Sequence, residues 1–321
     1  MWHSPLATVA EPRVTEFSSG STVDGMAPKL PSQHPKLPRE LERLIFEMAA
    51  SSQGNICNLI LVASRVKEWV EPLLYRVIAS ENFAGRPIAP LNTLVHKIGS
   101  KPSVFWSTSV KSLVFFPDPT ARNLDNEALE RILAACTGLV RLRTAPLHSR
   151  FLPALGNFSA LRHLCTEITT LFGGVSLVDF AHPAFRNITH LELLDDVPDE
   201  TAHQICNGLA HIPKLTHIAF NAEVLYRALF PLLHLFTHLR AIVLFGDDEE
   251  YDLNLPVGLT MDERFISIEQ EDWHRDWLCG ADTGEDFWAL ADEFLAARRA
   301  GKVDRSCFHI YDQENGWRVN S

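Results

Sequence analysis

The sequence lacks the features that identify membrane-spanning and exported proteins. Its longest apolar runs, 59–63 and 229–236, fall far short of the roughly 20 residues that a membrane helix needs. The N-terminus has no basic region followed by an apolar core, and Glu11, Glu16 and Asp24 stand where a transit peptide avoids acids. These absences predict a protein of the cytoplasm or the nucleus, with no membrane as partner.

Cysteine is scarce and scattered, which excludes two further classes. The six cysteines contain no CxxC pair and are Cys57, Cys136, Cys165, Cys206, Cys279 and Cys307. A zinc site or a disulfide framework needs closely spaced cysteines, so neither is expected. Buried free thiols in a reducing compartment are the simpler interpretation.

Motifs of catalysis and cofactor binding are missing as well. None of the 14 histidines belongs to an HExxH, a Cys-His metal spacing or a GxSxG elbow, and no GxGxxG or GxxxxGK[ST] loop is present to bind phosphate. His190 and His217 each follow a threonine in matching contexts. A repeated structural role for these two is simpler than a shared ligand pocket. The sequence therefore predicts a non-enzymatic protein without metal or cofactor.

The net charge of −11 is concentrated near the C-terminus. Residues 246–293 contain sixteen Asp or Glu against Arg264 and Arg275, a local charge of −16 + 2 = −14. Binding of phosphates requires clustered Lys and Arg, so nucleic acid is not expected as a partner of this region. A solvated acidic face explains these residues more simply than a docking site for a basic protein.

Composition predicts a folded chain behind a disordered tail. Hydrophobic residues make up 46% and charged residues 21%, near the globular average. Residues 1–35, however, are rich in Ser, Thr, Pro and Gly, with isolated apolar residues such as Trp2 and Phe17. Because this stretch has no helical or strand period, we expect it to be disordered.

Two amphipathic helices are predicted within residues 36–79. The first opens near Pro38, and its apolar stripe is formed by Leu41, Leu44, Ile45 and Met48. The second is expected over 58–70, with Leu59, Val62, Val66, Trp69 and Val70 on one face. Gly54 and Asn55 are expected to form the intervening turn, and Pro72 to mark the end of the second helix or a kink. Residues 73–78 then fit a short helical turn that runs into a strand.

Beyond residue 80, three apolar positions recur with the spacing x, x+3, x+5. Full copies are Val110-Leu113-Phe115, Ile188-Leu191-Leu193, Leu215-Ile218-Phe220 and Leu239-Ile242-Leu244, and partial copies are Leu139-Leu142 and Leu161-Leu164. The copies are 29, 22, 27, 27 and 24 residues apart, within the period of 20 to 29 residues typical of leucine-rich repeats. Each copy predicts a strand whose core must be completed by its neighbours.

Helices are predicted between these strands and after them. The segments 127–136, 201–209 and 224–233 have helical patterns, and 264–268 is a further strand. Residues 285–299 predict a strong helix with a buried stripe of Phe287, Leu290, Ala291 and Phe294. We expect this helix to cap the last repeat. The asparagine or cysteine that follows the third apolar position in standard repeats is not regular, so the array is expected to be irregular.

Four short motifs occur between Leu37 and Ile78: Leu37-Pro38-x-Glu40-Leu41, Ile45-Phe46, Leu61-Val62 and Arg65-Val66-x-x-Trp69. In these motifs the segment resembles an F-box. With Ile188-Thr189-His190-Leu191, Leu215-Thr216-His217-Ile218 and Asp286-Phe287-Trp288 added, the whole layout from Leu37 to Gly301 resembles a family of fungal F-box-like proteins. The resemblance implies docking onto the Skp-type adaptor protein of a cullin-RING ubiquitin ligase, through Leu37, Pro38, Leu41, Ile45, Leu61, Val62 and Trp69. Trp69 is the candidate anchor by residue type. The alternative role for these side chains is packing of the helices onto the repeat body.

The predicted architecture is therefore α/β. A disordered tail (1–35) precedes a short helical F-box-like module (36–79) and an irregular leucine-rich-repeat-like α/β solenoid with an acidic C-terminal helical cap (80–321). The predicted function is a protein-interaction adaptor, a substrate receptor of a cullin-RING ligase with an unknown protein target. The alternative is a repeat scaffold whose N-terminal helices only cap the solenoid, without a link to ubiquitin. That alternative predicts a buried Trp69 and no apolar patch on the helices.

Overall fold

The computed structural model describes residues 37–50, 53–79, 91–115, 126–245, 255–269 and 273–310. The chain divides into two compact units, Met1–Glu42 and Arg43–Ser321, and the boundary falls inside helix α1 (Arg39–Ala50). The tail predicted to be disordered, 1–35, lies outside the described residues. Nearly all the described structure belongs to the second unit.

A nine-stranded parallel sheet, paired in chain order, runs through the second unit and establishes the α/β class. Its strands are β1 (Val77–Ala79), β2 (Ser112–Phe115), β3 (Arg141–Thr144), β4 (His163–Thr166), β5 (His190–Leu193), β6 (His217–Phe220), β7 (Ala241–Phe245), β8 (Phe265–Ile268) and β9 (His309–Ile310). Each full or partial copy of the apolar spacing coincides with a strand from β2 to β7. The predicted strand at 264–268 is β8, whereas β9 was not expected.

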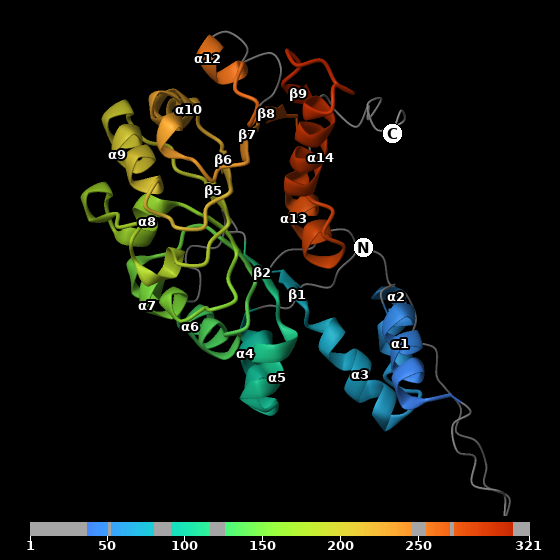
Figure 1. Ribbon diagram of the computed structural model, residues 1–321. Helices are drawn as coiled ribbons and strands as arrows, with labels where there is room; N and C mark the ends of the chain where they lie inside the picture. The colour runs from blue at the N-terminus through green and yellow to red at the C-terminus, as the bar shows by residue number, and fades with distance from the viewer. Residues whose placement is uncertain are drawn as a thin grey trace, which may run out of the picture. The chain divides into compact units, whose positions relative to one another are not determined.

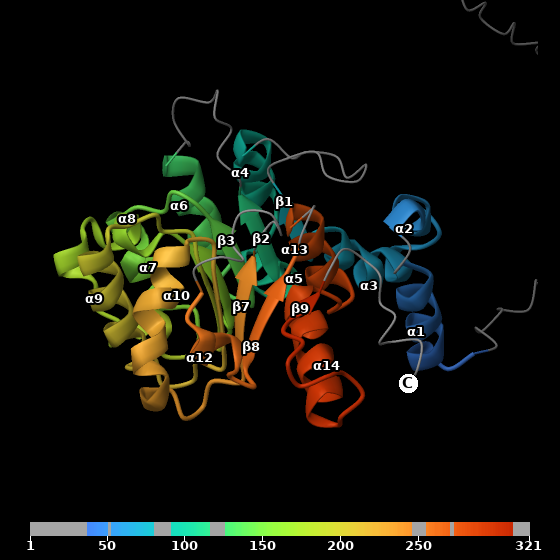
Figure 2. The same cartoon turned by 90° about the horizontal axis from the view of Figure 1, so that it is seen from above.

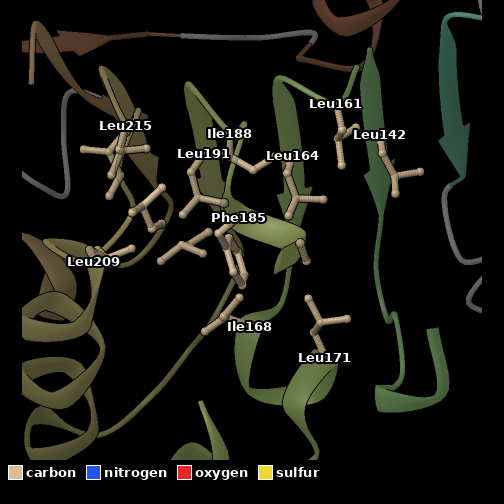
Figure 3. Close-up of a cluster of buried hydrophobic side chains, with 14 of the residues drawn as sticks. Leu142, Leu161, Leu164, Ile168, Leu171, Phe185, Ile188, Leu191, Leu209 and Leu215 are labelled. Atoms are coloured by element: carbon tan, nitrogen blue, oxygen red, sulfur yellow. The ribbon is translucent and has the colours of Figure 1, made fainter. Parts of the chain in front are cut away.

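The register aligns the central leucines of the copies into a ladder. Leu142, Leu164, Leu191, Ile218 and Ile242 are paired across β3 to β7. The first apolar position of each copy, such as Leu161 or Ile188, is buried in the turn before the strand. Figure 3 shows Leu142, Leu164 and Leu191 of the strands on the same side of the sheet as Ile168, Leu171 and Leu209. Each unit therefore shares its core with the next, since one short strand cannot bury its apolar face alone.

Helices connect the strands along this first face of the sheet (Figure 1). They are α4 (Leu91–Ser100), α5 (Ser103–Ser109), α6 (Asn126–Ala135), α7 (Leu152–Gly156), α8 (Ile168–Phe172), α9 (Asp199–Leu209), α10 (Glu223–Leu229) and α12 (Val257–Thr260). Short 3₁₀ turns lie at Ser149–Phe151, Val175–Leu177, Pro183–Phe185 and Phe230–Leu235. The helices expected at 127–136, 201–209 and 224–233 are α6, α9 and α10, the last continued as a 3₁₀ turn.

Helices α13 (Trp273–Asp282) and α14 (Phe287–Arg299) lie on the opposite face of the sheet (Figure 2). Their Trp277, Phe287 and Trp288 share a second core with Ala219 and Val243 of the strands. The helix predicted at 285–299 is α14, and Asp286 caps it by accepting a hydrogen bond from the Ala289 amide. The expected position was wrong, because α14 covers a sheet face instead of the end of the array. A second apolar face on β6 to β8 has to be covered as well.

The described helices contain no segment long and apolar enough to cross a membrane.

Candidate interaction surface

The helices α2 (Gln53–Leu59) and α3 (Ser64–Leu74) form a small core together with the end of α1. Ala50, Ile56, Val66, Trp69 and Val70 are buried there. The rings of Phe46 and Trp69 face each other with their centroids 6.4 Å apart. This core belongs to the helical module itself and needs no side chain of the sheet.

The single helix predicted over 58–70 is wrong. Residues 60–62 form a turn, and Gly54 and Asn55, which were expected to be the turn, lie within α2. The break allows Ile56 of α2 and Val66 of α3 to fold against the same core, which one straight helix would not permit. Pro72 lies in the last turn of α3, close to where the end of the helix was expected.

The turn and the outer stripe of α1 expose large apolar side chains. The exposed fractions are 82% for Leu61 and 60% for Val62 in the turn, and 52% for Leu44, 52% for Ile45 and 67% for Met48 on α1. We refer to these five residues as the apolar surface of the module. The helical stripe predicted for α1 is therefore present, but it faces solvent. Large exposed apolar areas are uncommon on monomers and usually mark an interaction site.

The residues predicted to bind an adaptor do not all lie in one environment. Ile45, Leu61 and Val62 belong to the apolar surface, and Leu37, Pro38 and Leu41 in the first compact unit are also exposed. Trp69 is only 8% exposed, because it packs inside the module. The scaffold alternative predicted a buried Trp69 and no apolar patch: Trp69 is buried, but exposed apolar side chains are present.

The module is tied to the start of the sheet through α3. Lys101 donates to the Glu71 carboxylate over 2.8 Å, and the Tyr75 ring packs edge-on against Phe105 and Trp106 at 5.5 and 5.0 Å. Burial and the charge of Glu71 raise the pKa of Tyr75. Helix α3 therefore serves both the module's own core and the first units of the body.

A row of ionisable side chains lies on the second face of the sheet, beneath α14. The rings of His163, His190 and His217 stack across β4, β5 and β6, with centroids 4.0 and 4.1 Å apart. Trp288 lies edge-on to the latter two, and Asp292 is 3.1 Å from the Nε2 atom of His217. Burial lowers the pKa of His163 to about 2 and also lowers the pKa of His190, and the charge of Arg141 adds to the effect on both.

The three histidine rings of this row do not have the geometry of a metal site. Stacked parallel rings direct their nitrogens side by side, so they do not converge on one point. The described residues contain no group of three or more His, Cys, Asp or Glu that would hold a metal ion. The Nδ1 atoms of His190 and His217 instead lie 2.8 Å from the hydroxyls of Thr189 and Thr216. The Thr-His repetition thus reflects a shared strand position.

A buried ion pair lies beside this row. Arg143 of β3 donates to both carboxylate oxygens of Glu192 on β5, at 2.9 and 3.1 Å. The indole nitrogen of Trp277 donates to the same carboxylate over 2.8 Å. At the edge of the row, Arg141 pairs with Asp286 over 2.5 Å. The covering helices are therefore held by charged hydrogen bonds as well as by apolar packing.

Sequence reasoning missed this covered face, although a signal was present. Ala219, Val243 and Ile266 alternate with the ladder positions and are themselves apolar. A strand that is apolar on both alternating sets of positions is buried on both faces. The second face of the sheet is consequently covered by the chain's own helices α13 and α14.

Comparison of the sequence with models of protein families and with curated proteins finds no match.

Proposed function

We propose that the protein is a non-enzymatic adaptor of the cytoplasm or nucleus. Residues 36–79 act as an F-box-like module that docks a Skp-type adaptor of a cullin-RING ligase, and the remaining body is a leucine-rich-repeat-like solenoid that presents a target protein. The observation that carries this proposal is the apolar surface of the module.

The exposed residues are not required by the fold of the module. Its core is completed by Ile56, Val66, Trp69 and Val70, while Leu61 is 82% exposed. Full burial of a leucine side chain is favourable by roughly 1.5 to 3 kcal/mol. A partner that buries Leu61 on binding would gain a free energy of this order. A helical partner surface with apolar side chains is the complement that this region favours.

The order of the strands supports the repeat part of the proposal. Nine parallel strands follow one another in chain order, and the leucine ladder continues from one unit to the next. Such arrays separate a scaffold role from the choice of target, which lies in surface side chains.

Binding to a purified, immobilised Skp-type adaptor tests the proposal. The wild-type chain should be retained, and Ile45→Glu or Leu61→Glu should reduce retention by about tenfold or more, because each buries an unpaired charge in the contact. Val104→Glu is the matched control, since Val104 is 65% exposed on α5, outside the module. It should behave as wild type. Circular dichroism should give the same thermal transition for all three variants.

No retention of wild type, or equal retention of all the variants, would exclude the adaptor role. The scaffold alternative would then remain, and the burial of Trp69 and the contacts of Tyr75 with Phe105 and Trp106 are the observations that favour it.

A further inference from the structure

The turns that lead into strands β2 to β7 carry cations without acids. The turns that lead into β2 to β7 are residues 108–111, 137–140, 157–162, 186–189, 211–216 and 237–240, and they contain Lys111, Arg162, Arg186, Lys214 and Arg240 but no Asp or Glu. Because all the strands are parallel, these turns lie at the same edge. We call these five residues the basic edge.

The opposite edge has the reverse charge. Glu167 follows β4, Asp195 follows β5, Glu223 follows β6 and Glu269 follows β8. For β4, β5 and β6 the turn before each strand therefore carries a cation and the turn after it an acid, although the chain as a whole is acidic at −11. Such sorting gives the basic edge a positive local field that the net charge conceals.

The basic edge directs its charge to solvent. Arg186, Lys214 and Arg240 are exposed. Within the described residues none of the five forms an ion pair: Arg162 donates to the carbonyls of Ser159 and Leu161, and Lys214 donates to the Asn187 side-chain oxygen. The other two arginines of the sheet, Arg141 and Arg143, are by contrast paired with carboxylates beneath the covering helices.

The spacing of the basic edge fits an extended chain. Adjacent strands are roughly 4.8 Å apart, so the leading turns of β4 to β7 offer one cation about every 5 Å, whereas an extended peptide advances roughly 3.3 Å per residue. A peptide laid across the turns therefore meets a cation about every one to two residues. Each carboxylate on it can find a partner without a change in the protein.

A groove of about 840 Å³ adjoins the end of this edge near β7 and β8. Its apolar lining includes Leu233, Phe236 and Leu239, and its Arg, Asp and Glu side chains are Arg240, Arg264, Arg299, Glu263 and Asp292. Arg264 is already paired with Asp262, and Glu263 offsets one further cation. The groove is thus nearly neutral, and it suits an apolar side chain flanked by acids better than a row of phosphates.

We propose that the basic edge and this groove bind an acidic, extended peptide segment of a partner protein. Helices α13 and α14 cover the second face of the sheet, so a charged ligand can reach the basic edge more readily than that face. The proposed function is needed only to identify the peptide as the target of a ligase; binding itself is independent of any adaptor. Nucleic acid is disfavoured, since the groove that continues the edge is nearly neutral and partly apolar and so offers no further row of cations to a phosphate backbone.

Fluorescence anisotropy with a labelled twelve-residue peptide of Asp and Glu around a central leucine tests the assignment. The full chain should bind it, and binding should weaken as NaCl is raised from 50 to 200 mM. The variant Arg186→Glu/Lys214→Glu/Arg240→Glu should bind about tenfold more weakly. The control Lys67→Glu/Lys97→Glu/Arg131→Glu changes the net charge equally, at exposed positions on α3, α4 and α6 away from the edge, and should bind within about twofold of wild type.

Three outcomes would overturn the proposal: no binding by wild type, equal losses in the two triple variants, or tighter binding of a twelve-nucleotide single-stranded DNA than of the peptide. Thermal unfolding establishes that both variants are folded. Because the assay contains no adaptor, its failure is separate from failure of the adaptor-binding experiment.

Discussion

The stacked histidines under α14 make the stability of the protein depend on pH in a defined window. His163 and His190 are held in the neutral form, since burial lowers both pKa values below the ordinary value of 6.5. Nearby Arg141 and His217 oppose protonation further, while Asp292 favours it for His190. In the unfolded chain both rings bind a proton near pH 6.5.

The stability of the folded chain decreases as the pH falls, because proton binding and unfolding are linked. Because the folded pKa is the lower one, the unfolded state binds more protons as pH falls, and folded stability decreases. The stabilising contribution of the two neutral histidines is fully present well above pH 6.5, and it decreases as the pH falls through 6.5 toward their folded pKa values. Between pH 7.5 and 5.5 each histidine costs roughly 1 to 2 kcal/mol of folded stability, so His163 and His190 together cost roughly 3 kcal/mol.

Urea denaturation at pH 7.5 and pH 5.5 measures this loss. His163→Phe keeps a ring in the stack but cannot titrate, and the replaced Nδ1 atom has no hydrogen-bond partner in the described part of the chain. This variant should lose roughly 1 to 2 kcal/mol less than wild type over the same interval. His238→Gln, at an exposed histidine, should match wild type. Equal losses in wild type and His163→Phe would refute the reasoning.

Two further predictions concern packing. Glu192→Gln should lower the free energy of unfolding by about 3 to 5 kcal/mol in urea, since Arg143 loses its buried carboxylate. An Arg143→Met/Glu192→Leu double variant should recover part of this and not all, because the Trp277 indole N–H loses its acceptor; no recovery would contradict the ion-pair argument. Gly208→Ala should destabilise by about 1 to 3 kcal/mol despite alanine's helix propensity, because the new methyl would lie 2.7 Å from the Phe180 ring. Gly156→Ala, with its nearest contact at 3.6 Å, is the control, and equal thermal midpoints for the two variants would contradict the steric account.

The strands were predictable because their signal is local. The x, x+3, x+5 spacing places one residue in the turn and two on one strand face, and β2, β5, β6 and β7 follow it directly. In the partial copies the third position is Thr144 or Thr166, both buried, so the strand persists although the apolar signal weakens. The repetition of the spacing along the chain also predicts that the strands pair with their neighbours in one sheet, since a single unit cannot bury its apolar face alone.

The covering helices were not predictable in position because nothing local encodes which surface a helix meets. The stripe of α14 identifies Phe287 and Phe294 as buried but not what buries them. The partners of α13, such as Glu192, lie far away in the sequence. For the candidate site, exposure of Ile45 and Leu61 and burial of Trp69 were equally compatible with the same helical period, since a stripe shows which side chains share a face and not whether that face is covered.

Contacts of α13 with β1 and β2, and of α14 with β7 and β8, connect distant parts of one array. In an open array each unit touches only its neighbours, so terminal units can melt alone and pieces can be deleted. Here α13, near the C-terminus, packs against β1 and β2 near the start of the sheet, so removing either element exposes apolar surface on the other. Unfolding should accordingly proceed as one event across the whole sheet, and the array has no unit that can be removed without loosening the others.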